Sequence, residues 1–260
     1  MCLLMKEIKI LFEDEDIIVC HKPAGVATEG ARVGSMDVVN FARNYLARKN
    51  RASGKKGSGK PPYVATVSRL DQPVEGVLVL AKTKAAATSL SKQIKEKTTD
   101  KYYYALSFGS VQEKSGHLTD YIARKESDGN AIILTEKEKD SLKDNVVVLD
   151  SGEKCRILDG GISNAELDYE VVAEENEMTL FKIKLLTGRY HQIRAQLSHL
   201  GHPILGDQKY GSADSKAFSE SQGIKDVCLV CYKFAFDHPK TGKRTEFSVK
   251  PYNPQIGSIL

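Results

Sequence analysis

A short segment in the first third of the chain combines an arginine and an aspartate with the features of a rigid turn. Residues 68–76 read Ser-Arg-Leu-Asp-Gln-Pro-Val-Glu-Gly and lead into an apolar run at 77–80. A loop that contains Pro and Gly and feeds a core strand is a place where a rigid element presents a reactive group, here the carboxylate of Asp71 beside Arg69. On this segment alone, a surface ion pair is the explanation that we favour.

A second candidate segment, residues 186–194, carries two arginines. Its sequence, Leu-Thr-Gly-Arg-Tyr-His-Gln-Ile-Arg, places Arg189 before an expected helix and Arg194 within it. Guanidinium groups at such a position suit the binding of a phosphate or a carboxylate. Arginines on an ordinary helix surface are the alternative.

Three histidines in this part of the chain raise the question of a metal site. They are His191, His199 and His202, and Asp207 follows them. His191 and His199 are two helical turns apart, too far for joint ligation without a bend, and the chain has no His-Glu-x-x-His motif. We therefore predict that these residues bind no metal.

The positive charge of the chain is concentrated in one segment. Residues 43–60 hold seven basic residues and no acidic one, and without those seven the net charge of +4 would become −3. Residues 51–62 are rich in Gly, Ser, Lys and Pro, which predicts a flexible basic loop at about 50–62. We expect Lys55, Lys56 and Lys60 to lie against a nucleic-acid backbone. A solvated surface loop is the alternative.

The same loop partly matches a nucleotide-binding motif. Residues 54–60 satisfy the first seven positions of a phosphate-binding P-loop. The eighth position requires a Ser or Thr hydroxyl, and Pro61 occupies it. We therefore expect no nucleotide cofactor.

Three consecutive tyrosines follow Lys101 in an expected strand. The alternation of a strand places Tyr102 and Tyr104 on one face and Tyr103 on the other. An aromatic ring on a functional face stacks well on a nucleic-acid base, whereas packing in the core is the more usual role of a tyrosine in a strand.

The elements that must position these residues are strands and helices without regular alternation. Strand patterns occur at residues 8–12, 17–20, 77–82, 101–108, 165–173, 178–186, 227–236 and 244–249. Helical spacing occurs at 37–49, 84–97 and 191–200, the last with Gly201 as a left-handed C-cap. Residues 113–163 show weak strand signals, so we expect hairpins and loops there. The pattern predicts an α+β fold with a mixed, largely antiparallel sheet flanked by helices.

Composition excludes several classes of protein. The chain has 260 residues, 41% hydrophobic and 28% charged, which is typical of a globular protein and not of a disordered one. No apolar run approaches the roughly 18 residues of a membrane helix, and the first residues make a poor signal peptide. Five cysteines, an odd and sparse set, fit a reducing compartment, so we expect a cytoplasmic protein without a membrane partner. We interpret Cys228 and Cys231 as strand residues and not as a zinc or redox pair.

Taken together and in this order, the motifs resemble those of the RluA family of RNA pseudouridine synthases over most of the chain. The matching segments are His21-Lys22-Pro23-Ala24-Gly25, Arg69-Leu70-Asp71 with Gly76, and Lys101-x-Tyr103-x-Ala105. The longest match runs from Thr187-Gly188-Arg189-x-His191-Gln192-Ile193-Arg194 to Gly201-His202-Pro203-Ile204-x-Gly206-Asp207-x-x-Tyr210-Gly211.

The resemblance implies roles for individual residues. It makes Asp71 the nucleophile, Tyr103 the active-site tyrosine that stacks on uracil, and Arg194 the partner that keeps Asp71 charged. It also implies that Arg69 helps to fill the space left by a flipped base. We assign Arg189 to the binding of substrate phosphate, and we expect His191 and Gln192 to bind substrate as well.

The resemblance further implies an enzyme without metal or cofactor. We expect one pseudouridine synthase catalytic domain over residues 1–260, without the separate N-terminal RNA-binding domain of some relatives, that acts as a monomer. The expected substrate is ribosomal RNA or transfer RNA, and ribosomal RNA is favoured. The alternatives are a catalytically inactive RNA-binding protein on the same scaffold and a metal-dependent nucleic-acid hydrolase.

The chain departs from the family pattern around Asp71. Ser68 stands where a histidine is usual, and Val74 and Glu75 stand where Thr-Ser or Thr-Thr is usual. A carboxylate facing the site would disfavour ionised Asp71 and repel phosphate, so we predict that Glu75 faces away from it.

Overall fold

The computed structural model describes residues 7–31, 34–54 and 60–260, which form two compact units. Unit 1 comprises Met1–Tyr102 and Val230–Gly257, and unit 2 comprises Tyr103–Leu229 and Ser258–Leu260. Within the described residues, no helix has the length and apolarity needed to cross a membrane.

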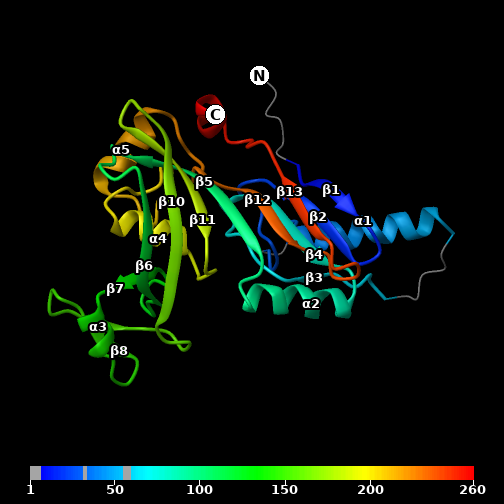
Figure 1. The fold of residues 1–260 in the computed structure, drawn as a ribbon, viewed down its shortest axis with the longest axis horizontal. Coiled ribbons are helices and arrows are strands. Elements are labelled where there is room, and N and C mark those ends of the chain that lie inside the picture. The colour runs from blue at the N-terminus through cyan, green and yellow to red at the C-terminus, as the bar shows by residue number, and fades with distance from the viewer. Residues whose placement is uncertain (1–6, 32–33, 55–59) are drawn as a thin grey trace. The chain divides into compact units, whose positions relative to one another are not determined.

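The strands of unit 1 form a mixed sheet in the order β1-β2-β4-β12 (Figure 1). The strand β3 pairs with β4, and β13 pairs with β12. All of these pairs are antiparallel except β4–β12, which is parallel. The strand bounds are β1 Lys9–Glu13, β2 Ile17–Lys22, β3 Ala65–Thr66, β4 Glu75–Ala81, β12 Leu229–Asp237 and β13 Arg244–Ser248.

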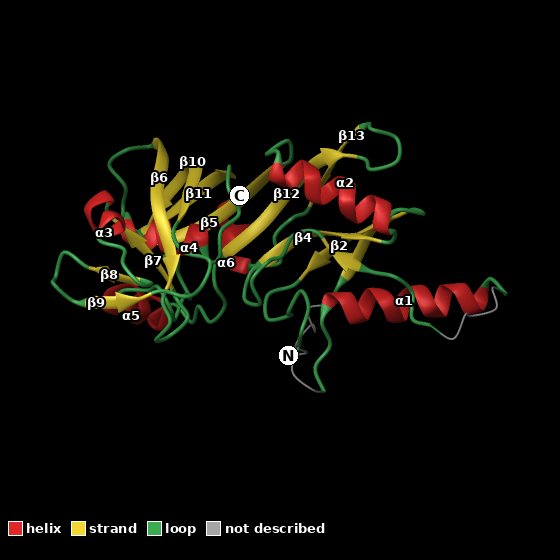
Figure 2. Ribbon diagram, turned by 90° about the horizontal axis from the view of Figure 1, so that it is seen from below, coloured by secondary structure: helices red, strands yellow, loops and turns green. Residues whose placement is uncertain are grey.

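Two helices accompany this sheet, α1 (Val38–Ala52) and α2 (Lys84–Lys95). Figure 2 shows α2 on one side of β2 and β4 and α1 on the other. Ala86 and Leu90 of α2 pack against alternate residues of β2 and β4 and against Phe234 and Phe236 of β12. Every residue of β4 is buried, because the strand has neighbours along both edges and is covered by side chains.

Unit 2 is built on the strand order β5-β11-β10-β6-β7. Its central strand β10 pairs antiparallel with β11 on one edge and with β6 on the other, as Figure 1 shows. The helix α4 packs against β6 and β7. The bounds are β5 Asp100–Phe108, β6 Ser115–Arg124, β7 Ala131–Leu134, α3 Glu136–Asp140, β8 Val146–Val148, β9 Lys154–Arg156, β10 Ser163–Glu175, β11 Met178–Leu185, α4 Gln192–His199 and α5 Ala213–Ser221; the last helix of the chain, α6, is Pro254–Ile259.

The predicted fold class is confirmed, and most predicted elements are present to within a few residues. Gly201 has a φ of 89° and follows the C-cap of α4, as the sequence predicts. Several elements differ from prediction. The helix α1 continues to Ala52 and not only to residue 49, so it includes the first residues of the predicted basic loop. The helices α3, α5 and α6 were not predicted, whereas β6 and β7 pair as a hairpin within residues 113–163, where hairpins and loops were expected.

Candidate active site

The loop that carries Asp71 is held by hydrogen bonds to the segment that follows β2. The Thr28 hydroxyl donates to the carbonyl of Leu70 at 2.8 Å and accepts from its backbone N–H at 3.2 Å. On the other side of Asp71, the Gly25 N–H donates to the carbonyl of Gln72 at 2.9 Å. The backbone is therefore fixed on both sides of the half-buried Asp71.

Lys22 is a fully buried cation beneath this loop, with an exposed fraction of 0%. Its Nζ atom donates to three backbone carbonyls, those of Val26 (2.6 Å), Pro23 (3.1 Å) and Gln72 (3.1 Å). Burial lowers the pKa of Lys22 to about 7, and the negative charges of Asp71 and Glu75 act in the opposite direction. When protonated, this ammonium favours the ionised form of Asp71.

Glu75, four residues after Asp71, is buried and bonded to a distant part of unit 1. Its Oε1 accepts from His21 Nε2 at 2.8 Å and from the Tyr252 N–H at 2.6 Å, and its Oε2 accepts from the Asn253 N–H at 3.0 Å. The His21 ring also stacks on Tyr252, with 3.9 Å between centroids. Glu75 therefore holds residues 252–253 of the chain against the start of β4.

Gly76 closes the loop at a position that excludes any side chain. Its φ is 143°, and a Cβ atom there would lie 2.4 Å from the carbonyl oxygen of Cys231. Since β4 and β12 pair in parallel at this point, only glycine allows the two backbones to approach so closely.

Arg69 directs its side chain into solvent. The side chain is 72% exposed, and its Nη1 lies 3.6 Å from a carboxylate oxygen of Glu29. An exposed pair at this separation contributes little to stability. The ion pair that the sequence suggested between neighbouring residues is thus made by Arg69 with a different carboxylate.

In unit 2, Arg194 of α4 forms a buried two-point pair with Asp207. Its Nε donates to Oδ2 at 2.6 Å and its Nη2 donates to Oδ1 at 2.8 Å. Its guanidinium also lies over the ring of Tyr210, 5.0 Å from the centroid. Sequence reasoning considered Asp207 only as a metal ligand and missed this role.

His191 precedes α4 in a left-handed conformation, with a φ of 53°. Its Nδ1 lies 2.7 Å from the hydroxyl of Tyr210, which also accepts from the Ala131 N–H at 2.7 Å. Burial and then the charge of Arg194 lower the pKa of His191 to about 3. The ring is therefore neutral at pH 7, and the Tyr210 hydroxyl is free to donate its proton to Nδ1.

Gln192 uses its whole side-chain amide inside unit 2. Its Oε1 accepts from the Thr187 hydroxyl at 2.9 Å and from the Arg189 N–H at 3.0 Å. Its Nε2 donates to the carbonyl of Glu166 at 3.1 Å and to Gln196 Oε1 at 3.0 Å. This geometry makes Gln192 the residue that shapes the loop before α4.

The remaining candidates are distributed over both units. Tyr103 is buried in β5 with 5% exposure, while Tyr102 and Tyr104 are partly exposed, in agreement with the predicted alternation. Asp71 belongs to unit 1, and Tyr103 and Arg194 belong to unit 2. Lys60 is exposed, and Lys55 and Lys56 lie outside the described residues.

The side chains that could bind a metal are dispersed in the described part of the chain. Among residues 7–31, 34–54 and 60–260, no three His, Cys, Asp or Glu side chains are grouped so that they could hold a metal ion. Cys228 and Cys231 are buried thiols; Cys231 lies in β12, and Cys228 directly precedes this strand.

Comparison with known proteins connects this geometry to a family. Residues 16–199 match the RNA pseudouridylate synthase family. The chain is 30% identical to an uncharacterized RNA pseudouridine synthase of Aquifex aeolicus, over 94% of this chain and 69% of the relative. It is also 30% identical to a ribosomal large subunit pseudouridine synthase C of Pasteurella multocida, over 98% of this chain and 67% of the relative.

Two solved structures share the fold. Human RNA Pseudouridylate Synthase Domain Containing 4 superposes with a TM-score of 0.69 at 20% identity, covering 96% of this chain and 90% of that one. Human RNA Pseudouridylate Synthase Domain Containing 1 gives a TM-score of 0.66 at 22% identity, with coverage of 98% and 88%. The family predicted from the motifs is confirmed.

Proposed function

The chain belongs to the RNA pseudouridylate synthase family, and on that basis we propose that it converts uridine to pseudouridine in ribosomal RNA, with Asp71 as the reacting carboxylate. Membership makes the protein an isomerase that acts on RNA. The ribosomal name of the Pasteurella multocida relative supports ribosomal RNA over transfer RNA.

The reaction needs a carboxylate and no change of oxidation state. The bond between N1 of uracil and C1′ of the ribose breaks, and a bond between C5 and C1′ forms. The proton on C5 leaves to solvent, and N1 gains a proton, so the atoms balance. Asp71 serves either by attacking C1′ or by removing a proton from the sugar, and both routes require its ionised form.

The observation that carries this proposal is the bracing of the Asp71 loop. Thr28 and Gly25 fix its backbone on both sides of Asp71, and the three carbonyl bonds of Lys22 hold a buried cation below it. A fixed carboxylate near a positive charge is what a nucleophile with a low pKa needs. Neither a simple RNA-binding surface nor a solvated turn requires such a fixed aspartate.

The other assignments complete the proposed site. By the family motif, Arg194, whose orientation Asp207 fixes, serves to keep Asp71 ionised, and Tyr103 serves to stack on the target uracil. Arg69 helps to fill the space left by the flipped nucleotide. The exposed Arg189 binds substrate phosphate, and His191 with Gln192 shapes the loop that presents it. Lys55, Lys56 and Lys60 contact the RNA backbone.

Release of tritium from RNA labelled at C5 of uracil tests the proposal. We expect the wild-type protein to release label from ribosomal RNA, and Asp71→Asn to release none. Asp140→Asn serves as the matched control, because Asp140 is an exposed aspartate of α3; this variant should react like wild type. Label released equally by wild type and Asp71→Asn would overturn the role of Asp71.

Three further outcomes separate the alternatives. Release from transfer RNA and not from ribosomal RNA would replace the proposed substrate. Tight binding of ribosomal RNA by the wild-type protein without release of label would favour an inactive RNA-binding protein. A chelator that abolishes activity would favour the metal-dependent alternative.

A further inference from the structure

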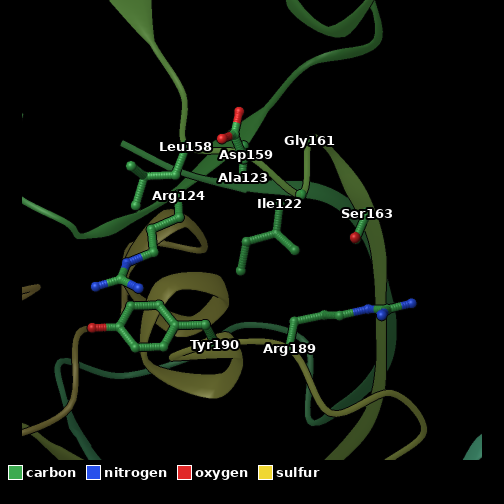
Figure 3. Close-up of a pocket in the computed structure, with 10 residues that line it drawn as sticks. Ile122, Ala123, Arg124, Leu158, Asp159, Gly161, Ser163, Arg189 and Tyr190 are labelled. Atoms are coloured by element: carbon green, nitrogen blue, oxygen red, sulfur yellow. The ribbon is translucent and has the colours of Figure 1, made fainter. Parts of the chain in front are cut away.

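An open cavity in unit 2 lies between the end of β6, the loop that precedes β10 and the loop that precedes α4 (Figure 3). Its volume is about 200 Å³. Ile122 and Ala123 contribute apolar surface, and the side chains of Arg124, Tyr190 and Arg189 contribute the larger polar groups. None of the roles assigned above, apart from phosphate binding by Arg189, involves this cavity.

One side of the cavity is a stack of three flat groups. The Arg124 guanidinium carbon lies 4.4 Å above the centroid of the Tyr190 ring, and Tyr190 stacks on His191 with 3.7 Å between centroids and 20° between planes. His191 is itself bonded to Tyr210. Arg124 Nε donates to the carbonyl of Gly129 at 2.9 Å. The guanidinium is therefore held flat, although Arg124 is an exposed residue.

Tyr190 thus contacts both the His191 ring and the Arg124 guanidinium, and among the described residues Tyr190 is the one aromatic ring over which this guanidinium lies. A planar cation presented in this way offers its outer face to a nucleic-acid base, because arginine stacks on π-systems as aromatic rings do. Holding the guanidinium in place beforehand reduces the entropy lost when a ligand binds.

The opposite side of the cavity carries a second cation. Arg189 uses its Nε to donate to the carbonyl of Asn164 at 2.9 Å, and its terminal nitrogens have no partner among the described residues. In Figure 3, Ile122 lies between the side chains of Arg124 and Arg189. The cavity thus has an apolar floor with one guanidinium on each side.

The acidic residue at the rim does not cancel this charge. The Asp159 carboxylate is turned away from Tyr190 and Arg189 in Figure 3, and its Oδ1 accepts from Asn145 Nδ2 at 3.2 Å. An anionic ligand therefore meets two cations inside the cavity.

We propose that this cavity binds one nucleotide of the substrate RNA other than the target uridine. The base lies over Ile122 and stacks on the outer face of Arg124, and the adjoining phosphate binds the terminal nitrogens of Arg189. The proposal rests on the RNA substrate proposed above and adds a second contact point on unit 2. A flat base with an attached phosphate matches an apolar floor between two guanidinium groups better than a peptide carboxylate does.

Steady-state kinetics with C5-labelled ribosomal RNA, together with filter binding, test this subsite. Because a stacked base loses its partner when the planar group is removed, we expect Arg124→Ala to raise KM and Kd by about tenfold. The effect should fall on KM and not on kcat. Arg124→Lys, which keeps the charge but not the planar group, should recover only part of the affinity. Arg189→Gln should raise Kd and lower the slope of log Kd against log salt by about one.

Arg156→Gln is the matched control. Arg156 is an exposed arginine of unit 2 that lies outside this cavity and pairs with Glu126 at 3.5 Å. Its replacement should leave KM and Kd unchanged. Thermal unfolding of each variant shows whether it is folded at the assay temperature. If Arg124→Ala is not folded there, the comparison of Arg124→Lys with wild type still tests the subsite.

Two outcomes would overturn the subsite. They are KM and Kd values for the folded Arg124 and Arg189 variants equal to those of wild type, or an equal loss of affinity in Arg156→Gln. If the wild-type protein releases no label, the proposed reaction fails, and filter binding of unlabelled ribosomal RNA still decides the subsite separately. A phosphopeptide that competes with RNA for the cavity at equal affinity would assign it to a protein partner instead.

Discussion

The guanidinium of Arg194 and the carboxylate of Asp207 face each other across two hydrogen bonds, with side-chain exposures of 4% and 0%. A pair of this kind fixes the plane of the guanidinium as well as its position. Asp207 therefore determines how Arg194 is presented, and the pair uses Nε and Nη2 of the arginine.

Asp207→Asn should destabilise the protein by about 3 kcal/mol, because it removes the carboxylate charge that two hydrogen bonds hold against a buried guanidinium. Because asparagine has nearly the shape of aspartate, the decrease in the free energy of unfolding measures the loss of the charge and not a change in packing. Urea unfolding measures the change, with Asp140→Asn as the exposed control. A free energy of unfolding within 0.5 kcal/mol of wild type, roughly the range of neutral surface changes, would contradict the importance of this pair.

Lys22 should make stability depend on pH in alkaline solution. Burial lowers its pKa from 10.5 to about 7, so between these values the unfolded chain binds a proton that the folded chain does not. The free energy of unfolding therefore rises with pH across this window, by at most about 1.4 kcal/mol per pH unit from this group. Below pH 7, Lys22 is charged in both the folded and the unfolded chain, and the free energy of unfolding is reduced by the full cost of burying this charge.

Lys22→Met removes this titrating group. Urea unfolding at steps from pH 7 to pH 10 should show wild type gaining stability relative to the variant as pH rises. Parallel curves for the two proteins would mean that Lys22 does not titrate in this range. The variant should also lower kcat by about tenfold, since the carbonyl of Gln72, next to Asp71, keeps the Gly25 N–H but loses its side-chain donor.

Glu75→Ser, which introduces a residue usual in the family, should loosen the segment around Tyr252 and Asn253. The carboxylate accepts two backbone N–H groups there, and hydrogen bonds to a charged group contribute about 1.5–3 kcal/mol each. Hydrogen exchange of residues 250–257 should become faster, and turnover should not increase. Glu75→Gln, which keeps an acceptor oxygen, should show a smaller change.

A substantial rise in turnover in Glu75→Ser would contradict this account. It would mean that the carboxylate faces the substrate and that its hydrogen bonds to the backbone are incidental.

Replacement of Lys55, Lys56 and Lys60 by Gln should weaken RNA binding and flatten its salt dependence. Each lost phosphate contact removes about 0.9 from the slope of log affinity against log salt on a duplex, and about 0.7 on a single strand. Filter binding at several salt concentrations measures this slope, and thermal unfolding should be unchanged. The control replaces three exposed lysines elsewhere, Lys92, Lys137 and Lys240. An unchanged slope would identify the segment as a solvated loop.

Sequence patterns located the elements whose burial is continuous or strictly periodic. The run at β4 is buried at every position, and it was predicted as a strand. The strand β6 was predicted only as part of a region of hairpins and loops, without bounds, because its polar residues alternate with small and half-buried ones and its conformation depends on pairing with β10, a neighbour distant in sequence. The helix α5 was missed because two serines are its buried residues, which leaves no apolar stripe to read.

The candidate site was likewise predicted only in part from the sequence. Motif spacing pointed to Asp71 and Arg194, but not to what holds them. Thr28 is 42 residues from Leu70, and Lys22 is 50 residues from Gln72. Contacts over such distances depend on how β2 and β4 pair, which no local pattern records. The buried Glu75 departed from the family motif, and that departure was the one local sign of its long-range role.

The bond between Glu75 and the backbone of Asn253 joins residues 178 positions apart. During synthesis, the Asp71 loop and β4 therefore emerge long before residues 252–253, whose backbone N–H groups donate hydrogen bonds to the Glu75 carboxylate. A chain that stops short of residue 252 buries Glu75 with His21 as its partner, or leaves this end of β4 open to solvent. In an incomplete chain Glu75 therefore lacks two of its three hydrogen-bond donors, and the end of β4 that follows the Asp71 loop is less firmly held than in the complete chain.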